Sequence, residues 1–157
     1  MSLSFVHKSE IRLQNPPLVE VVCQVKFPPI LSIAREIPSE FQERIRNKFP
    51  ELAVEQGLLV KVPGIGSKEM SAAEVQPKIY RFQSGDGNAT ISLAADFYAL
   101  STSHYTHWED FVGWLMLASE AVQQVYAPPY STRIGLRYVN RLTLSNTGRK
   151  TVTDMLA

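Results

Sequence analysis

Pairs of adjacent prolines divide this chain and limit where regular structure can form. They stand at positions 16–17, 28–29 and 128–129. Proline lacks a backbone N–H and fixes its own φ, so it is excluded from the interior of a helix and from the central ladder of a sheet. We therefore expect each pair to mark the beginning or the end of a helix or strand.

The segment LVEVVCQVKF, between the first two proline pairs, predicts a β-strand over residues 18–27. Side chains on successive residues of a strand point to opposite faces. One face would carry Val19, Val21, Cys23, Val25 and Phe27. The other would carry Leu18, Glu20, Val22, Gln24 and Lys26, so it mixes apolar with polar side chains.

Apolar residues at four-residue spacing predict a helix over residues 40–49. The apolar positions are Phe41, Ile45 and Phe49. Ser39 is in position to cap the amino end, with Gln42 three residues later, and Pro50 would stop the helix.

A second helix is predicted within THWEDFVGWLMLASEAVQQVY, before the last proline pair. Thr106 and Glu109 have the spacing of a capping box, in which each side chain bonds the backbone N–H of the other residue. One apolar stripe runs along five turns and comprises Trp108, Phe111, Leu115, Ala118, Val122 and Val125.

Further strands are predicted between these helices. GLLVKVP indicates a strand over residues 57–63, followed by a loop over residues 63–77. Residues 78–84 and 89–95 are expected to pair as a hairpin around a Ser-Gly-Asp-Gly-Asn turn, whose glycines can adopt positive φ. A third run, residues 98–103, would continue this meander.

The last predicted strand, residues 132–144, has arginine at every fourth position: Arg133, Arg137 and Arg141. Alternation places these arginines on one face, together with Gly135 and Val139. The opposite face would carry Ile134, Leu136, Tyr138, Leu142 and Leu144. We expect the apolar face to pack against the helices and the arginine face to point away from them.

The resulting order, β-α-β-β-β-α-β, predicts an α+β fold. We expect an antiparallel sheet with two helices packed on one face. No repeat or linker separates parts of the sequence, so residues 1–157 are predicted to form a single domain.

Composition narrows the functional classes. Sixteen basic and fifteen acidic residues leave a net charge of +1, so a nucleic-acid site would have to be a local patch. No apolar stretch is long enough to predict a membrane span or a secretory signal, which makes the cytoplasm the expected compartment.

Motifs for catalysis, metals or cofactors are weak. His104, His107, Glu109 and Asp110 lie close together, but helix capping and the helix dipole explain the acidic residues. GIGSKE lacks the spacing of a phosphate-binding loop, and Cys23 lies within a strand, where a nucleophile is poorly exposed. We therefore predict no metal site, no cofactor and no catalytic residue.

Three segments in order carry a family resemblance: NPPLVEVVCQVKF, STSHYTHWEDF and RIGLRYVNRL. Together they resemble a sporadically distributed family of uncharacterised bacterial and archaeal proteins that has only a provisional name. The resemblance implies no activity, cofactor or catalytic residue. Members are usually longer than this chain, so it implies either the N-terminal part of a longer protein or a short member.

The arginine face leads to the functional hypotheses. If the first and last strands are neighbours, Arg133, Arg137 and Arg141 share a face with Glu20 and Gln24. One interpretation is a solvated face held by ion pairs between Glu20 and the arginines. The functional interpretation is a non-enzymatic protein-interaction module that uses this face or a sheet edge to bind another protein, a further segment of its own chain, or itself, for example as a homodimer. The second hypothesis is a nucleic-acid-associated protein, for which the family resemblance implies a sporadically inherited defence or toxin-linked locus. An enzyme is the third.

Overall fold

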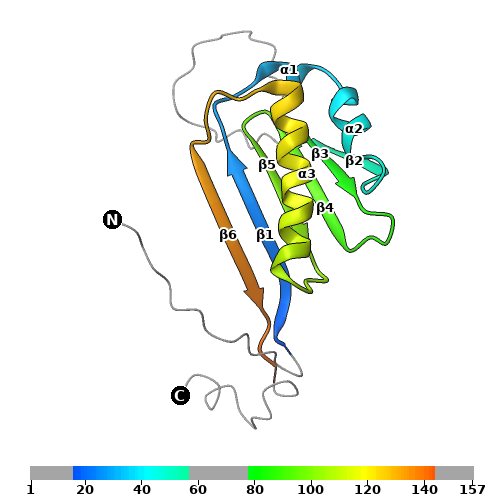
Figure 1. Cartoon of the computed structure of the whole chain (residues 1–157), viewed down its shortest axis with the longest axis vertical. Coiled ribbons are helices and arrows are strands. Elements are labelled where there is room, and N and C mark those ends of the chain that lie inside the picture. Colours follow the sequence, from blue (N-terminus) through cyan, green and yellow to red (C-terminus); the bar gives the residue numbers. More distant parts are fainter. Residues whose placement is uncertain (1–15, 57–77, 144–157) are drawn as a thin grey trace, which may run out of the picture.

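The computed structural model describes residues 16–56 and 78–143, which form one antiparallel sheet and three helices (Figure 1). The strand order across the six-stranded sheet is β2-β3-β4-β5-β1-β6. The elements along the chain are β1 (Leu18–Lys26), α1 (Leu31–Arg35), α2 (Ser39–Ile45), β2 (Glu51–Gln56), β3 (Lys78–Gln83), β4 (Ala89–Ala94), β5 (Phe97–Thr102), α3 (Trp108–Tyr126) and β6 (Arg133–Asn140).

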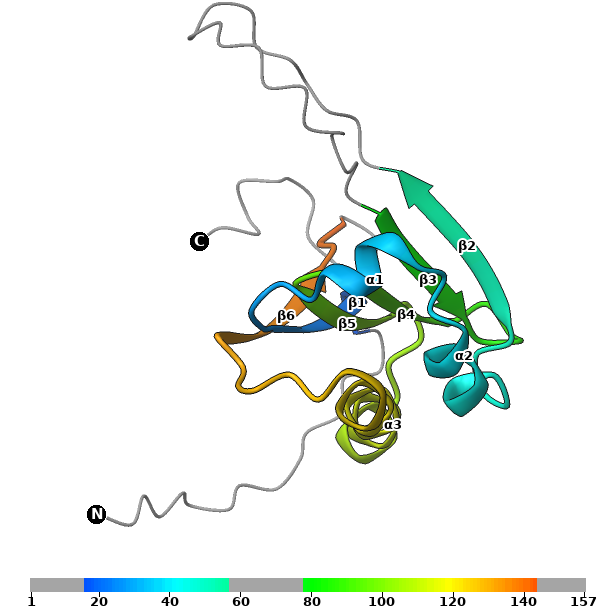
Figure 2. The same ribbon diagram turned by 90° about the horizontal axis from the view of Figure 1, so that it is seen from above.

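The predicted α+β class and the antiparallel sheet are confirmed. Strands β2 to β5 form a meander, and β1 then lies between β5 and β6. The α2 and α3 helices lie on the same side of the sheet, and no helix covers the other side in the described residues (Figure 2). This uncovered side is called the open face below.

The core lies between the helices and the middle of the sheet. Alternate residues of β1 point into it, so Val21, Cys23 and Val25 are buried as the sequence predicts. Phe41 of α2 packs on Phe82 of β3 with ring centroids 5.3 Å apart. This contact holds α2 over one end of the sheet, and α3 lies over its centre (Figure 1).

Two predicted helix caps are wrong. Ser39 is the first residue of α2 and makes no capping hydrogen bond, because the preceding Pro38 takes the N-cap position. The N-cap of α3 is His107, one residue after the predicted Thr106. The Thr106 hydroxyl instead donates to Asp110 Oδ2 at 2.8 Å, so its hydrogen bond goes to a side chain and not to the backbone of the helix.

Two further elements differ from expectation. The short helix α1 and the strand β2 were not predicted. The strand predicted over residues 57–63 and the loop over residues 63–77 lie outside the described residues. In the apolar stripe of α3, Phe111, Ala118 and Val122 are buried, whereas Trp108 at the first position is 46% exposed.

The predicted hairpin is confirmed, with β3 and β4 joined by a turn that depends on Gly87 and Asp86. Gly87 has φ +73°, a conformation that favours glycine. The Asp86 carboxylate accepts hydrogen bonds from the Ser84 hydroxyl at 2.6 Å and from the Asn88 backbone and side-chain nitrogens. These bonds lower the Asp86 pKa from 3.8 to about 2.

Because the folded-state pKa of Asp86 is lowered, its carboxylate favours the fold above the unfolded value of 3.8, and this contribution is lost as the pH falls toward about 2. We expect the stability difference between the native chain and Asp86→Asn to shrink between pH 5 and about pH 2. Denaturant unfolding at several pH values measures this. A pH-independent difference would contradict the assigned hydrogen bonds.

Matched leucine substitutions test where the core ends. Leu100, at the centre of the sheet, is 0% exposed, and Leu136, on the edge strand β6, is 44% exposed. Leu100→Ala should cost about 2–5 kcal/mol of unfolding free energy because it leaves a cavity. Leu136→Ala should cost less than about 1 kcal/mol. Denaturant melts of both variants measure the difference, and equal losses would place Leu136 in the core.

Candidate interaction surface on the edge strand

The geometry of β6 is set by the end of α3 and by pairing with β1. Ala127 adopts a left-handed conformation with φ 43°, and its N–H bonds the carbonyls of Val122 and Gln123, which closes the helix before Pro128. The Thr132 N–H then donates to the Lys26 carbonyl at 2.8 Å. From there β6 runs antiparallel to β1, with one irregularity in the register between Leu18 and Glu20.

The outer edge of β6 has no neighbouring strand in the described residues. The backbone N–H and C=O groups on that side of an edge strand can pair with another extended chain. All residues of β6 except Gly135 and Val139 are exposed, and those two are half-buried. Within residues 16–56 and 78–143, the strand therefore presents one free edge and exposed side chains on both faces.

Apolar side chains of β6 lie on the helix side of the sheet but are not covered. Ile134, Leu136 and Tyr138 stand opposite Val25, Cys23 and Val21, which are buried. The three β6 side chains are 70%, 44% and 45% exposed. We predicted that they pack under the helices, and this is wrong because α3 covers β4 and β5 rather than the β6 margin (Figure 1).

One aromatic contact ties this margin to the start of α3. The rings of Tyr138 and Tyr105 meet edge to face, with centroids 5.9 Å apart. Tyr105 in turn packs on Phe111 of the core. Tyr138 is thus fixed at one end of the strand, while Ile134 and Leu136 extend from it as an open apolar strip. We call Ile134, Leu136 and Tyr138 the apolar strip.

The predicted arginine face is on the open side of the sheet. Arg137 stands opposite Val22, and Arg133 opposite Lys26. The Arg133 guanidinium extends along its own strand, with Nε and Nη2 3.9 Å from the place that a Cβ at position 135 would occupy. A Cβ at position 135 would meet the guanidinium at ordinary van der Waals distance, so the Arg133 side chain lies along the strand beside Gly135.

Glu20 and Gln24 lie on the same face as the arginines. Gln24 faces Gly135, and Glu20 faces Val139, which makes Glu20 a diagonal neighbour of Arg137. Arg141 follows the end of β6, and its N–H donates to the Pro17 carbonyl at 2.7 Å. Arg133, Arg137 and Glu20 form no ion pair within residues 16–56 and 78–143. The expected pairing of Glu20 with Arg137 is therefore not found in the described structure.

The middle of the open face is organised by Arg81. Its buried Nε lies 2.7 Å from Glu55 Oε1 as an ion pair without hydrogen-bond geometry, and Nη1 donates to Ser92 Oγ at 3.4 Å. Hollows of about 180 and 210 Å³ adjoin this side chain. Both are smaller than the roughly 300 Å³ at which ligand pockets begin. This face is better suited to a flat contact than to enclosing a small molecule.

The histidine and carboxylate cluster makes contacts among its own neighbouring residues at the start of α3. His107 Nδ1 lies 3.6 Å from Asp110 Oδ2, the same oxygen that accepts from Thr106. Among the described residues, no group of three His, Cys, Asp or Glu side chains could hold a metal ion. Nor does that part of the chain contain a helix with the length and hydropathy needed to span a bilayer.

Comparison with known proteins gives no further assignment: no family model, curated protein or solved structure matches this chain. The candidate site is therefore defined by the chain's own geometry. In that geometry β6 brings together a free edge, the apolar strip and two arginines without ion-pair partners in the described residues.

The pair Arg137 and Glu20 tests whether the arginine face is covered. Both residues are exposed, so Arg137→Ala and Glu20→Gln should each change the unfolding free energy by less than about 0.5 kcal/mol. Denaturant melts of the two purified variants measure this. Losses of about 3–5 kcal/mol in both would instead show a buried ion pair beneath a covering segment.

Proposed function

We propose that this chain is a non-enzymatic protein-interaction module that binds an extended polypeptide segment along β6. The observation that carries the proposal is the exposure of the apolar strip on the helix side of β6, an edge strand that has only β1 as a neighbour in the described residues. An added strand would pair with the free backbone groups of β6 and extend the sheet.

Burial of the apolar strip would supply much of the binding free energy. Fully burying a side chain such as leucine or isoleucine stabilises by about 1.5–3 kcal/mol. Ile134, Leu136 and Tyr138 occupy alternate positions, so a bound strand would cover them with its own alternate residues. Apolar residues at every second position are therefore the expected feature of the ligand.

The arginines would contact the side chains on the other face of the bound segment and favour acidic residues there. Arg133 and Arg137 present planar donors that fit carboxylates on the open face. A segment with acidic residues on that face would complement them. The family resemblance noted above assigns no activity of its own, so the proposal depends on this geometry alone.

Nucleic-acid binding is less well supported. Single-stranded nucleic acid is commonly bound by aromatic side chains on which bases stack, next to basic residues. On β6 the aromatic residue, Tyr138, lies on the face opposite to Arg133 and Arg137. The arginines and the stacking surface are therefore separated by the sheet.

A random-peptide display selection against the immobilised full chain tests the proposed module. We expect enriched peptides to have alternating apolar residues and to lose at least about tenfold in affinity for the Leu136→Asp variant, because a charge would replace part of the apolar strip. Fluorescence anisotropy with labelled copies of the enriched peptides measures the affinity.

Met116→Asp is the matched control, because Met116 is 50% exposed on α3 and lies outside β6. It should bind the peptides as the native chain does. Equal affinity of the peptides for the native chain and Leu136→Asp would contradict the proposal. Binding of a random oligonucleotide that falls steeply with salt and is lost in Arg137→Ala would favour the nucleic-acid hypothesis instead.

A further inference from the structure

The strand at the opposite edge of the sheet, β2, carries apolar and charged residues on alternate faces as β6 does, but its charged residues are acidic. Glu51, Leu52, Ala53, Val54 and Glu55 are all exposed. Within the described residues β2 pairs with β3 and with no strand on its other side. The two free edges are at the two ends of the sheet (Figure 2).

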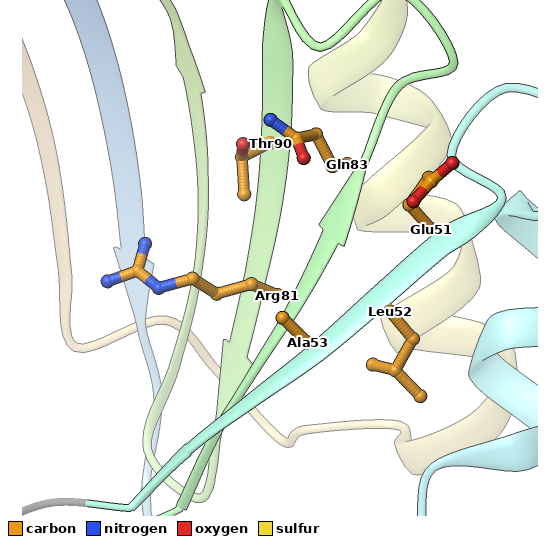
Figure 3. A pocket seen from close by; sticks show the side chains of 6 residues that line it. All are labelled: Glu51, Leu52, Ala53, Arg81, Gln83 and Thr90. Carbon is orange, nitrogen blue, oxygen red and sulfur yellow. The ribbon is translucent and has the colours of Figure 1, made fainter.

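Register assigns the β2 side chains to faces. Leu52 and Val54 stand opposite Phe82 and Tyr80, which are buried beneath the helices, so these two apolar residues lie on the helix side. Glu51 and Glu55 therefore lie on the open face, as does Ala53 between them. Figure 3 shows Leu52 pointing away from Arg81, Gln83 and Thr90, which gather on the other side of the sheet.

We propose that β6 of one molecule pairs with β2 of a second copy of this chain, so that the sheet continues from molecule to molecule. The inference rests on the proposed function of β6 and names its partner. It is carried by the complementarity of the two edges: arginines against glutamates on the open face, and apolar against apolar residues on the helix side.

Strand direction favours this pairing. Neighbours along the order β2-β3-β4-β5-β1-β6 are all antiparallel, so β2 and β6 run in opposite directions. A second copy placed beside the first in the same orientation brings its β2 antiparallel to β6. The helices of both copies then lie on the same side, and the alternation of strand directions continues across the junction.

One register matches the charged and the apolar side chains of residues 133–137 with those of residues 51–55. With Arg137 opposite Glu51, Arg133 stands opposite Glu55, because both pairs of charged residues are four positions apart. The same register places Leu136 opposite Leu52, Ile134 opposite Val54, and Gly135 opposite Ala53. Moving the register by two residues in either direction loses both charge pairs, so the charges fix the alignment.

Pairing of β6 with another β6 is less favourable. A two-fold axis between two antiparallel copies of one strand keeps the same faces together. Arg133, Arg137 and their counterparts would then crowd one face, and like charges across strands are destabilising. The β2 edge instead offers Glu51, which makes no ion pair in the described residues, and Glu55, which already contacts Arg81 at 2.7 Å.

The contact is heterologous, because each molecule contributes two different edges. Such a contact either closes into a ring or continues as an open series. Adjacent strands rotate by roughly 20–25° relative to one another, so successive copies would turn about the stack. We therefore expect a series of oligomers that lengthens with concentration rather than a discrete dimer.

Sedimentation velocity of the full chain over a range of concentrations tests the inference. The mean mass should rise with concentration, and either Arg137→Glu or Glu51→Arg should weaken association by at least about tenfold, because each creates like charges across the junction. An equimolar mixture of the two variants should regain association, since each variant then offers an edge complementary to the other.

The matched controls are Arg44→Glu and Glu120→Arg, exposed residues of α2 and α3 that reverse the same charges away from both edges. They should associate as the native chain does. A discrete dimer unaffected by Glu51→Arg, a monomer at all concentrations, or a mixture that fails to recover would each overturn the inference. Display peptides that still require Leu136 would then leave the proposed function of β6 standing.

Discussion

The antiparallel pairing of β6 with β1 is the contact on which the candidate surface depends. Because opposite residues of two paired strands share a face, the buried Val21, Cys23 and Val25 place Tyr138, Leu136 and Ile134 on the helix side. The arginines must then point to the open face. A shift of one residue in this register would exchange the two faces of β6, so that the arginines would lie on the helix side and Ile134 and Leu136 on the open face.

Side-chain alternation was sufficient to predict much of this arrangement. The β1 core face, the hairpin of β3 and β4, and the division of β6 into an arginine face and an apolar face follow from a period of two residues. Alternation does not say whether a face is covered. That depends on where α3 crosses the sheet, which is decided by long-range packing, so the exposure of Ile134 and Leu136 was not predicted.

The differences between the predicted and observed elements also have physical causes. In β2, Leu52 and Val54 alternate with Glu51 and Glu55, but the apolar run at residues 57–63 gave a stronger strand signal, and β2 was overlooked. The capping box at Thr106 matched a sequence pattern whose hydrogen bonds depend on backbone conformation, and His107 takes the cap position instead. The proposed complementarity of β2 and β6 depends on the position of β2, so it did not follow from the predicted strands.

Charge and apolar area would have separate roles at these edges. Exposed ion pairs contribute no more than about 1 kcal/mol each, so the arginines and glutamates would contribute little affinity. They can exclude wrong registers and wrong partners, because like charges directly opposite one another are unfavourable. Affinity would come from the backbone ladder and from covering Ile134 and Leu136. A junction built in this way is selective but weak, which is what a short edge contact between separate molecules requires if the assembly is to remain reversible.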